Sequence, residues 1–129
     1  MTKELDLCPS NKRNCVSSLE GESEKHFVEA IPVKGSEEEF CNSILQVLRS
    51  REDCKVKQED GGYIHAVFQT KWLKFKDDVE FLYNREKDVV DVRSASRLGH
   101  YDFDVNRKRV EELREAIREY GSSLEEKGS

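Results

Sequence analysis

Two short segments of this chain carry the residue types that proteins use to hold anions. One segment runs from Val92 to Gly99 and leaves a predicted strand, and the other, from Asn106 to Arg109, enters the last predicted helix. Hydroxyl groups, guanidinium groups and the free backbone N–H groups of a helix start all favour negative ligands. The sequence therefore predicts an anion or partner site made of Arg93, Ser94, Ser96, Arg97, Asn106 and Arg107.

The same residues could instead form an internal charge network that fixes the loop between residues 93 and 107. The cations from Arg107 to Arg109 lie where the helix dipole disfavours positive charge, so a negative group should be close by. Asp77, Asp78 and Asp102 are candidates within the chain, and a bound ligand is the other candidate. Pairing with aspartates of the chain would give these cations a structural role, whereas a bound ligand would give them a functional one.

Acid–base chemistry has a few candidates. Asp77 and Asp78 open a predicted strand as an acidic pair, and His65 could serve as a general base. Such acidic pairs more often accept backbone N–H groups or pair with arginine. The sequence lacks a nucleophile elbow, a phosphate-binding loop and a dinucleotide fingerprint, and no two histidines have metal-ligand spacing. We expect no metal and no cofactor.

Two amphipathic helices would support these segments. Ser36 and Glu39 form a capping box, and the apolar residues that follow recur at helical spacing until about Ser50. The last helix should run from about Val105 to Tyr120, with Asp104 as its N-cap. Gly121 suits the position after its end.

Strands should fill the chain between the helices. Residues 55–59, 63–70, 78–83 and 89–94 alternate in polarity or are rich in β-formers, and Asp60-Gly61-Gly62 is typical of a tight hairpin turn. Residues 27–31 would add a short strand. The sequence predicts an α+β fold: an antiparallel four- or five-stranded meander with both helices on one face, preceded by an extended N-terminal arm. The face toward the helices would carry Ile64, Phe68, Val79, Phe81, Val90 and Val92.

The opposite sheet face is expected to be polar. On it, His65, Glu80 and Arg93 would be neighbours across adjacent strands. Such a face is normally solvated. If the N-terminal arm folded over it, a partly buried polar site would result.

Length and charge limit the organisation and the partners. The chain has 129 residues and a net charge of −5. We expect one domain over residues 1–121, with residues 1–35 as the arm and residues 122–129 as a disordered tail. The acidic balance opposes nucleic-acid binding, and no apolar run is long enough to span a membrane. As given, the chain is expected to be cytoplasmic and, by default, monomeric.

Blocks spread along the chain resemble a known family. Cys8-Pro9-Ser10, the run from Asn14 to Ser18, the segments Tyr63 to Ala66 and Phe75 to Phe81, and the two segments described first are similar to the bacterial and plant family called domain of unknown function 1499. The resemblance covers Leu7 to about Tyr120. Arg13 stands where that family often has proline. The resemblance implies a fold and a set of marked residues, with no assigned activity or cofactor.

That resemblance draws attention to Cys8 and Cys15 among the four cysteines. Their separation allows a disulfide that would pin the arm, as expected in exported members of the family. In a reducing cytosol they would be two thiols, and redox or metal chemistry is a third reading. Many relatives carry a lipoprotein signal, membrane segments or a plastid transit peptide, and from the sequence as given we expect none of these here.

Three functions follow from these observations. The first is a non-enzymatic binding or accessory module that takes a small anion or a protein partner near residues 93–109. The second is a small enzyme for an anionic substrate, with Asp77, Asp78 or His65 as acid or base. The third is purely structural, with the marked residues fastening the arm to the sheet.

Overall fold

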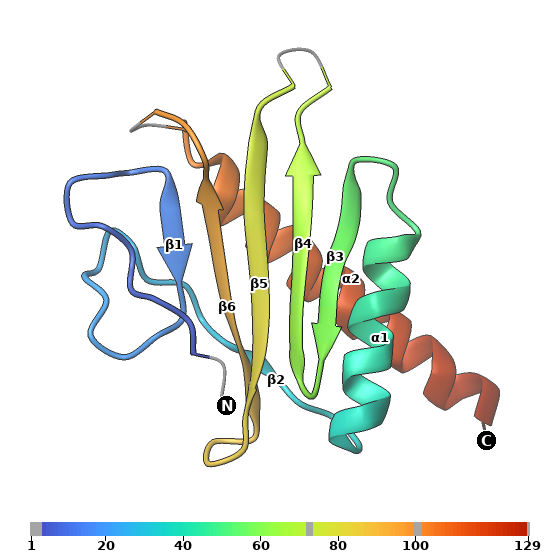
Figure 1. The fold of residues 1–129 in the computed structure, drawn as a ribbon. Helices are drawn as coiled ribbons and strands as arrows, with labels where there is room; N and C mark the ends of the chain where they lie inside the picture. Colours follow the sequence, from blue (N-terminus) through green and yellow to red (C-terminus); the bar gives the residue numbers. More distant parts are fainter. Residues whose placement is uncertain (1–3, 72–73, 100–101, 129) are drawn as a thin grey trace.

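The predicted α+β class is confirmed by the computed structural model, which describes residues 4–71, 74–99 and 102–128 (Figure 1). Over this part of the chain, a six-stranded antiparallel sheet has the order β1-β6-β5-β4-β3, and β2 also pairs with β6. The elements are β1 (Cys15–Ser17), β2 (Ile31–Pro32), α1 (Glu37–Arg49), β3 (Cys54–Asp60), β4 (Tyr63–Gln69), β5 (Lys76–Asn84), β6 (Val89–Ser96) and α2 (Val105–Gly128).

The central meander agrees with the sequence. β3 to β6 follow one another as antiparallel neighbours, each within a few residues of its predicted bounds. Gly61 and Gly62 both have positive φ, 52° and 93°, as a two-residue hairpin turn requires. A side chain at Gly62 would also meet the Glu37 carboxylate at 2.8 Å. The positive φ is what requires glycine there, because the flexible Glu37 side chain can move away from an added Cβ.

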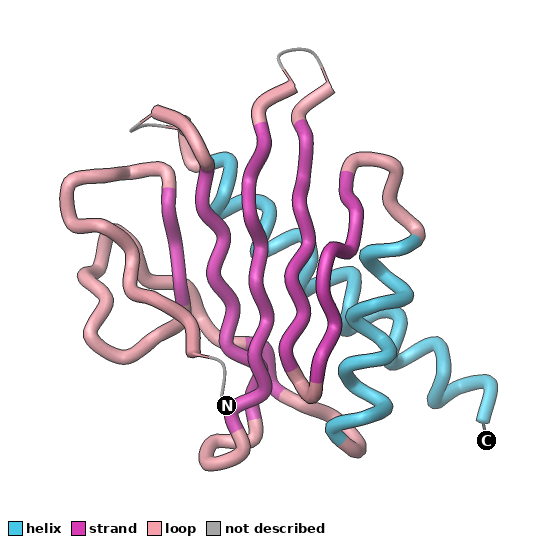
Figure 2. The backbone as a smooth tube through the Cα atoms, viewed as in Figure 1, coloured by secondary structure: helices cyan, strands magenta, loops and turns pink. Residues whose placement is uncertain are grey.

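The sheet has more strands than predicted, and the additional strands come from the arm. β1 and β2 extend the sheet on its β6 edge, with Val16 opposite Ser94 and Ile31 opposite Val90. The strand predicted over residues 27–31 was wrong, because ladder pairing begins only at Ile31 and Phe27 makes one isolated parallel bridge. The remainder of the arm is loop beside this edge (Figure 2). Strands of two or three residues are too short to show a period in sequence.

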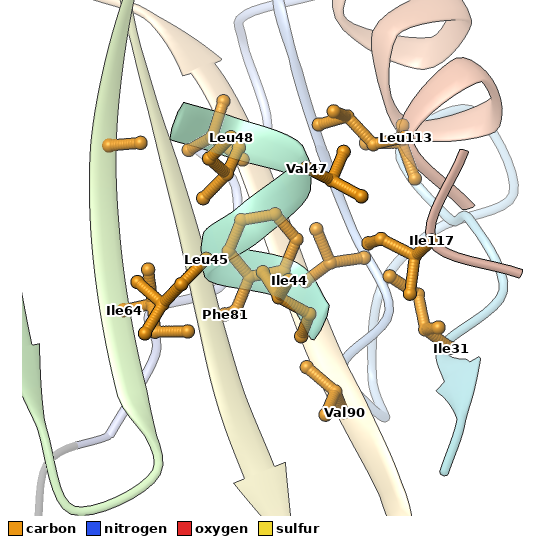
Figure 3. Packing of buried hydrophobic residues seen from close by; sticks show 14 of the residues in the cluster. Ile31, Ile44, Leu45, Val47, Leu48, Ile64, Phe81, Val90, Leu113 and Ile117 are labelled. Atoms are coloured by element: carbon orange, nitrogen blue, oxygen red, sulfur yellow. The ribbon is translucent and has the colours of Figure 1, made fainter. Parts of the chain in front are cut away.

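The core lies between the sheet and the two helices, as predicted (Figure 3). α1 begins after Ser36, whose hydroxyl accepts the Glu39 N–H at 3.1 Å. Ile44 and Leu48 of α1 and Leu113 and Ile117 of α2 are almost completely buried. They pack on the sheet face predicted from the alternation, and all six of its members are buried: Ile64, Phe68, Val79, Phe81, Val90 and Val92.

α2 begins at Val105, as predicted, but its predicted capping residue and its predicted end need correction. The side chain that caps its start belongs to Asp102, which accepts the Asn106 N–H at 3.0 Å, while Asp104 has a φ of 62°. The helix does not stop at Tyr120 but continues to Gly128, through the segment expected to be a disordered tail. Gly121 is not among the positive-φ glycines, and the leucine, glutamates and lysine that follow are good helix formers. In the described part of the chain, neither helix has the length and apolar character needed to cross a bilayer.

Candidate functional site

The sheet separates the residues that the sequence grouped into one anion site. In β6, Arg93 lies opposite Glu80 and its neighbour Ser94 lies opposite Val79, so the two side chains take opposite faces. Ser94 and Ser96 point toward the helices, whereas Arg93 lies on the face without helices, which we call the open face. Asp77 and Asp78 are divided in the same way. The predicted site therefore does not assemble as one pocket.

On the helix side, Asn106 is the centre of a buried hydrogen-bond cluster. Its Oδ1 accepts from the Ser94 hydroxyl at 2.6 Å, and its Nδ2 donates to Ser96 Oγ at 2.9 Å and Asp102 Oδ2 at 2.7 Å. Nδ2 also lies 3.1 Å from the Asn14 carbonyl oxygen. Asn106 and Ser94 are fully buried. The side-chain polar atoms of Asn106, Ser94 and Ser96 are therefore occupied within this cluster, which ties β6, the arm and the start of α2 together.

Arg109 and Asp77 form a buried ion pair beside this cluster. Arg109 Nη1 lies 2.7 Å from Asp77 Oδ2, and the two side chains are only 11% and 4% exposed. The same Nη1 donates to Asn106 Oδ1 at 2.9 Å, and the guanidinium lies over the Phe68 ring, 4.9 Å from its centre. Asp77 is thus one of the nearby acidic groups that were expected to offset the cations at the start of α2.

Arg107 fastens the arm. Its guanidinium donates to the Phe27 carbonyl at 2.7 Å and to the Lys25 carbonyl at 2.8 Å. The Asn14 amide performs a similar task and donates to the Leu98 and Gly99 carbonyls at 3.1 and 2.8 Å. For these residues the arrangement matches the charge-network and arm-fastening readings.

On the open face, Asp78 joins two predicted candidates. Arg97 donates to both of its oxygens, at 2.9 Å from Nε and 3.0 Å from Nη2, and His65 Nε2 lies 2.8 Å from Oδ1. The hydrogen bond from Arg97 is the main reason that the pKa of Asp78 lies below its ordinary value; burial opposes the shift and the bond with His65 adds to it. Asp78 is therefore a carboxylate in the physiological pH range.

Tyr63, Glu80 and Arg93 form the next polar group along this face. The Tyr63 hydroxyl donates to Glu80 Oε2 at 2.5 Å, and Arg93 Nη1 lies 3.8 Å from Glu80 Oε1. Burial, followed by the bond to Glu80, raises the pKa of Tyr63. The phenol therefore stays protonated and acts as a donor. His65, Glu80 and Arg93 are neighbours across the strands, as predicted.

Sequence reasoning missed a groove of about 600 Å³ at one end of the open face, where β4 leads into β5. We call it the lysine groove. Its described lining includes two acidic residues, Glu52 and Asp53, and the carboxylate of Asp53 is held by Arg51 at 2.9 and 3.0 Å. The cationic residues that line it are Lys55, Lys57, Lys71, Lys74, Lys76 and Arg97.

Strand register brings these cations together from separate parts of the chain. Lys55 of β3 lies opposite Val67 of β4, and Lys76 of β5 lies opposite Gln69 of β4. The signal available in sequence was the density of lysines on both flanks of the predicted 70–77 connection. The far end of the open face is different, since a groove of about 880 Å³ is lined there by Glu4, Glu37, Asp60, Glu86 and Asp91, with Arg85. The open face is thus polarised in charge along the strands.

The cysteine pair is a disulfide. Cys8 and Cys15 are joined, with their Cα atoms 5.7 Å apart, and the Cys8 N–H donates to the Glu22 carboxylate at 2.9 Å. Cys41 and Cys54 are free and half-buried. Burial raises the pKa of Cys41, and it raises that of Cys54 to about 11. Both are therefore unreactive thiols at neutral pH.

Taken together, the part of the chain that the structure describes is an α+β domain whose sheet is covered by helices on one face, with a charge-polarised second face and a disulfide-pinned arm. Within these residues no group of His, Cys, Asp and Glu is arranged to hold a metal ion. The chain belongs to the family of proteins of unknown function DUF1499, whose model matches residues 4–117. Among curated proteins, none matches the chain.

Proposed function

We propose that this protein is a non-enzymatic binding module that takes an anionic ligand in the lysine groove. One observation carries the proposal: a chain with a net charge of −5 concentrates six cations around one groove of its open face. A cluster of like charges opposes folding by self-repulsion, so a function that needs it explains its presence better than stability does.

The ligand class follows from the chemistry of the cations. Lysine ammonium groups are compact point charges on flexible stems, and they suit phosphate groups whose geometry varies. Arg97 stands at the rim of the groove and keeps its fork on Asp78. Of the predicted set Arg93, Ser94, Ser96, Arg97, Asn106 and Arg107, Arg97 lines the lysine groove. We place the site at the lysines because Ser94, Ser96, Asn106 and Arg107 already bond within the protein.

A second candidate is the enzyme hypothesis, which is favoured by the contact between His65 and Asp78. A half-exposed histidine bonded to a carboxylate is a known acid–base arrangement. Asp77 is a poor candidate since its carboxylate is buried against Arg109. Under this hypothesis His65→Ala would abolish turnover of a phosphate ester or related substrate without changing its binding.

Other expectations stay predictions. The protein was expected to be a monomer and to be cytoplasmic. The disulfide argues against a cytoplasmic location, because disulfides persist mainly in oxidising compartments. A protein partner is the alternative occupant of the site.

The test is a thermal-shift titration with phosphate, pyrophosphate and sulfate, followed by calorimetry. A ligand that binds only the folded state raises the melting temperature with its concentration. We expect Lys55→Glu/Lys76→Glu to lose at least tenfold in pyrophosphate affinity. Lys25→Glu/Lys34→Glu changes the net charge equally at exposed lysines outside the groove and should bind as the parent does. Equal loss in both variants, or no binding by the parent, would overturn the proposal.

A further inference from the structure

Exposed apolar side chains gather at the same end of the molecule as the lysine groove. Phe75 is 52% exposed, Leu98 76% and Phe103 77%. Of the six large apolar residues that are exposed in the described part of the chain, three lie in the two connections at this end, Phe75, Leu98 and Phe103, and a fourth, Val105, is the first residue of α2. The ends of β5 and β6 therefore combine positive charge with uncovered apolar surface.

Backbone hydrogen bonds bring the two connections together. The Arg97 N–H donates to the Lys76 carbonyl at 3.0 Å. Phe75 and Leu98 each follow one of these bonded residues toward the end of the sheet, where the chain after Arg97 turns to the arm and the Leu98 carbonyl accepts from the Asn14 amide. The base of the β4–β5 tip is also fixed internally, since the Thr70 N–H donates to the Phe75 carbonyl at 2.9 Å and the Phe75 N–H to the Thr70 hydroxyl at 2.9 Å.

The described residues that follow β4 and precede β5 extend past the helices and the other strands at this end of the sheet (Figure 1). Few intramolecular contacts can cover an aromatic ring there. Exposed apolar surface of this kind is costly in water unless a partner covers it. A rigid base that holds Phe75 outward is better explained by an external partner than by packing within the domain.

We propose that this end docks on the surface of an anionic lipid bilayer. The proposal rests on the anion-binding role of the lysine groove and names its ligand as lipid headgroup phosphate. The lysines contact the headgroups, while Phe75 and Leu98 enter the boundary between headgroups and acyl chains. Peripheral membrane proteins combine basic residues and exposed apolar residues on one side for this purpose.

The charge polarity of the open face fixes the orientation. The groove lined by Glu4, Asp60, Glu86 and Asp91 lies at the far end of the strands. An anionic surface attracts the lysine end and repels the acidic end, and the protein therefore meets the membrane end-on. Duplex nucleic acid would satisfy the lysines, but its paired and stacked bases would leave Phe75 and Leu98 in water.

The experiment measures cosedimentation of the disulfide-bonded protein with vesicles of phosphatidylglycerol and phosphatidylcholine, and with vesicles of phosphatidylcholine alone. We expect binding to the anionic vesicles that weakens with salt, and at least tenfold weaker binding to the neutral ones. Phe75→Ser/Leu98→Ser should lower vesicle affinity about tenfold and leave pyrophosphate affinity unchanged. Leu7→Ser/Phe27→Ser removes comparable exposed apolar groups elsewhere and should bind as the parent does.

The outcomes separate the two proposals. Pyrophosphate binding without vesicle binding would overturn membrane docking and leave the anion site standing. Loss of both would overturn both. Vesicle binding that depends on the lysines but is the same in Phe75→Ser/Leu98→Ser would overturn insertion, and tighter binding to duplex DNA than to anionic vesicles would overturn the choice of partner.

Discussion

Arg109 of α2 reaches through the helix side of the sheet to Asp77 of β5, with 2.7 Å between Nη1 and Oδ2, while the adjacent Asp78 faces the other way and bonds Arg97. Two consecutive aspartates thus serve two different parts of the molecule. The first pair belongs to the buried scaffold that holds the arm and α2 on the sheet. The second belongs to the open face, where we place binding.

Asp77→Asn should be strongly destabilising. It leaves the Arg109 guanidinium in a nearly dry environment without its counter-charge, and breaking such a pair costs about 3–5 kcal/mol. Urea denaturation at constant m-value measures the loss. Asp77→Asn/Arg109→Met removes both charges and should recover part of it, because the stranded charge is gone. A single variant as stable as the parent would contradict the buried pair.

Arg97→Ala should lower stability at neutral pH only slightly, since the Arg97 and Asp78 side chains are 44% and 29% exposed and water replaces much of the lost bonds. The variant should instead raise the pKa of Asp78 toward its ordinary value, because Arg97 is the largest cause of its depression. Carboxyl-carbon NMR titration measures this pKa, and Arg49→Ala is the control.

The linkage with pH follows from the direction of that shift. The pKa of Asp78 is lower in the folded chain than in the unfolded one, so its stabilising contribution is complete above the unfolded value of about 3.9. It is lost as the pH falls from there through the folded pKa. As the pH falls below about 5, the free energy of unfolding should therefore decrease more for the parent than for Arg97→Ala. Parallel pH profiles for the two proteins would contradict the assignment.

Reduction of the Cys8–Cys15 disulfide should loosen the arm. Closing so short a loop stabilises the fold by about 2–3 kcal/mol in the chain-entropy model. Cys8→Ser/Cys15→Ser should show the same loss under oxidising conditions, and dithiothreitol should have no further effect on it. Thiol titration of the unfolded oxidised protein should find Cys41 and Cys54 alone. A count of four free thiols would contradict the pairing.

Asn106→Ala should cost more than its size suggests. The change leaves the buried Ser94 hydroxyl without its acceptor, and such a group costs about 1–3 kcal/mol, whereas the Asn14 carbonyl loses one donor and keeps the Ser96 N–H. Native-state hydrogen exchange should report faster opening at β1 and the start of α2. Asn84→Ala is the matched control, since its bond to Asp91 at 3.2 Å is only half-buried.

Periodicity was enough to predict the sheet faces, and with them much of the fold. The alternation in β4 to β6 placed Val79, Phe81 and Val92 in the core correctly, and strict alternation also puts Asp77 and Ser94 there. The arm could not be predicted in the same way. β1 and β2 are held by pairing with β6, far along the chain, and two or three residues have no period to read.

The candidate site was harder to predict for a related reason. Sequence neighbours such as Arg93 and Ser94 were grouped although a strand sends them to opposite faces. The lysine groove gathers Lys55 and Lys76, which are distant in sequence and meet only through the register of β3, β4 and β5. The density of lysines around the β4–β5 connection is visible in the sequence. Only the pairing of the strands shows that these lysines line one groove.

The most direct test of the anion site is a titration of the uniformly labelled protein with pyrophosphate, followed by amide chemical shifts. We expect saturable shifts at Lys55, Lys57, Lys74 and Lys76, with little change near Asn106 and Arg107. Shifts confined to residues 102–109, or no saturable shift anywhere, would contradict the lysine groove as the binding site.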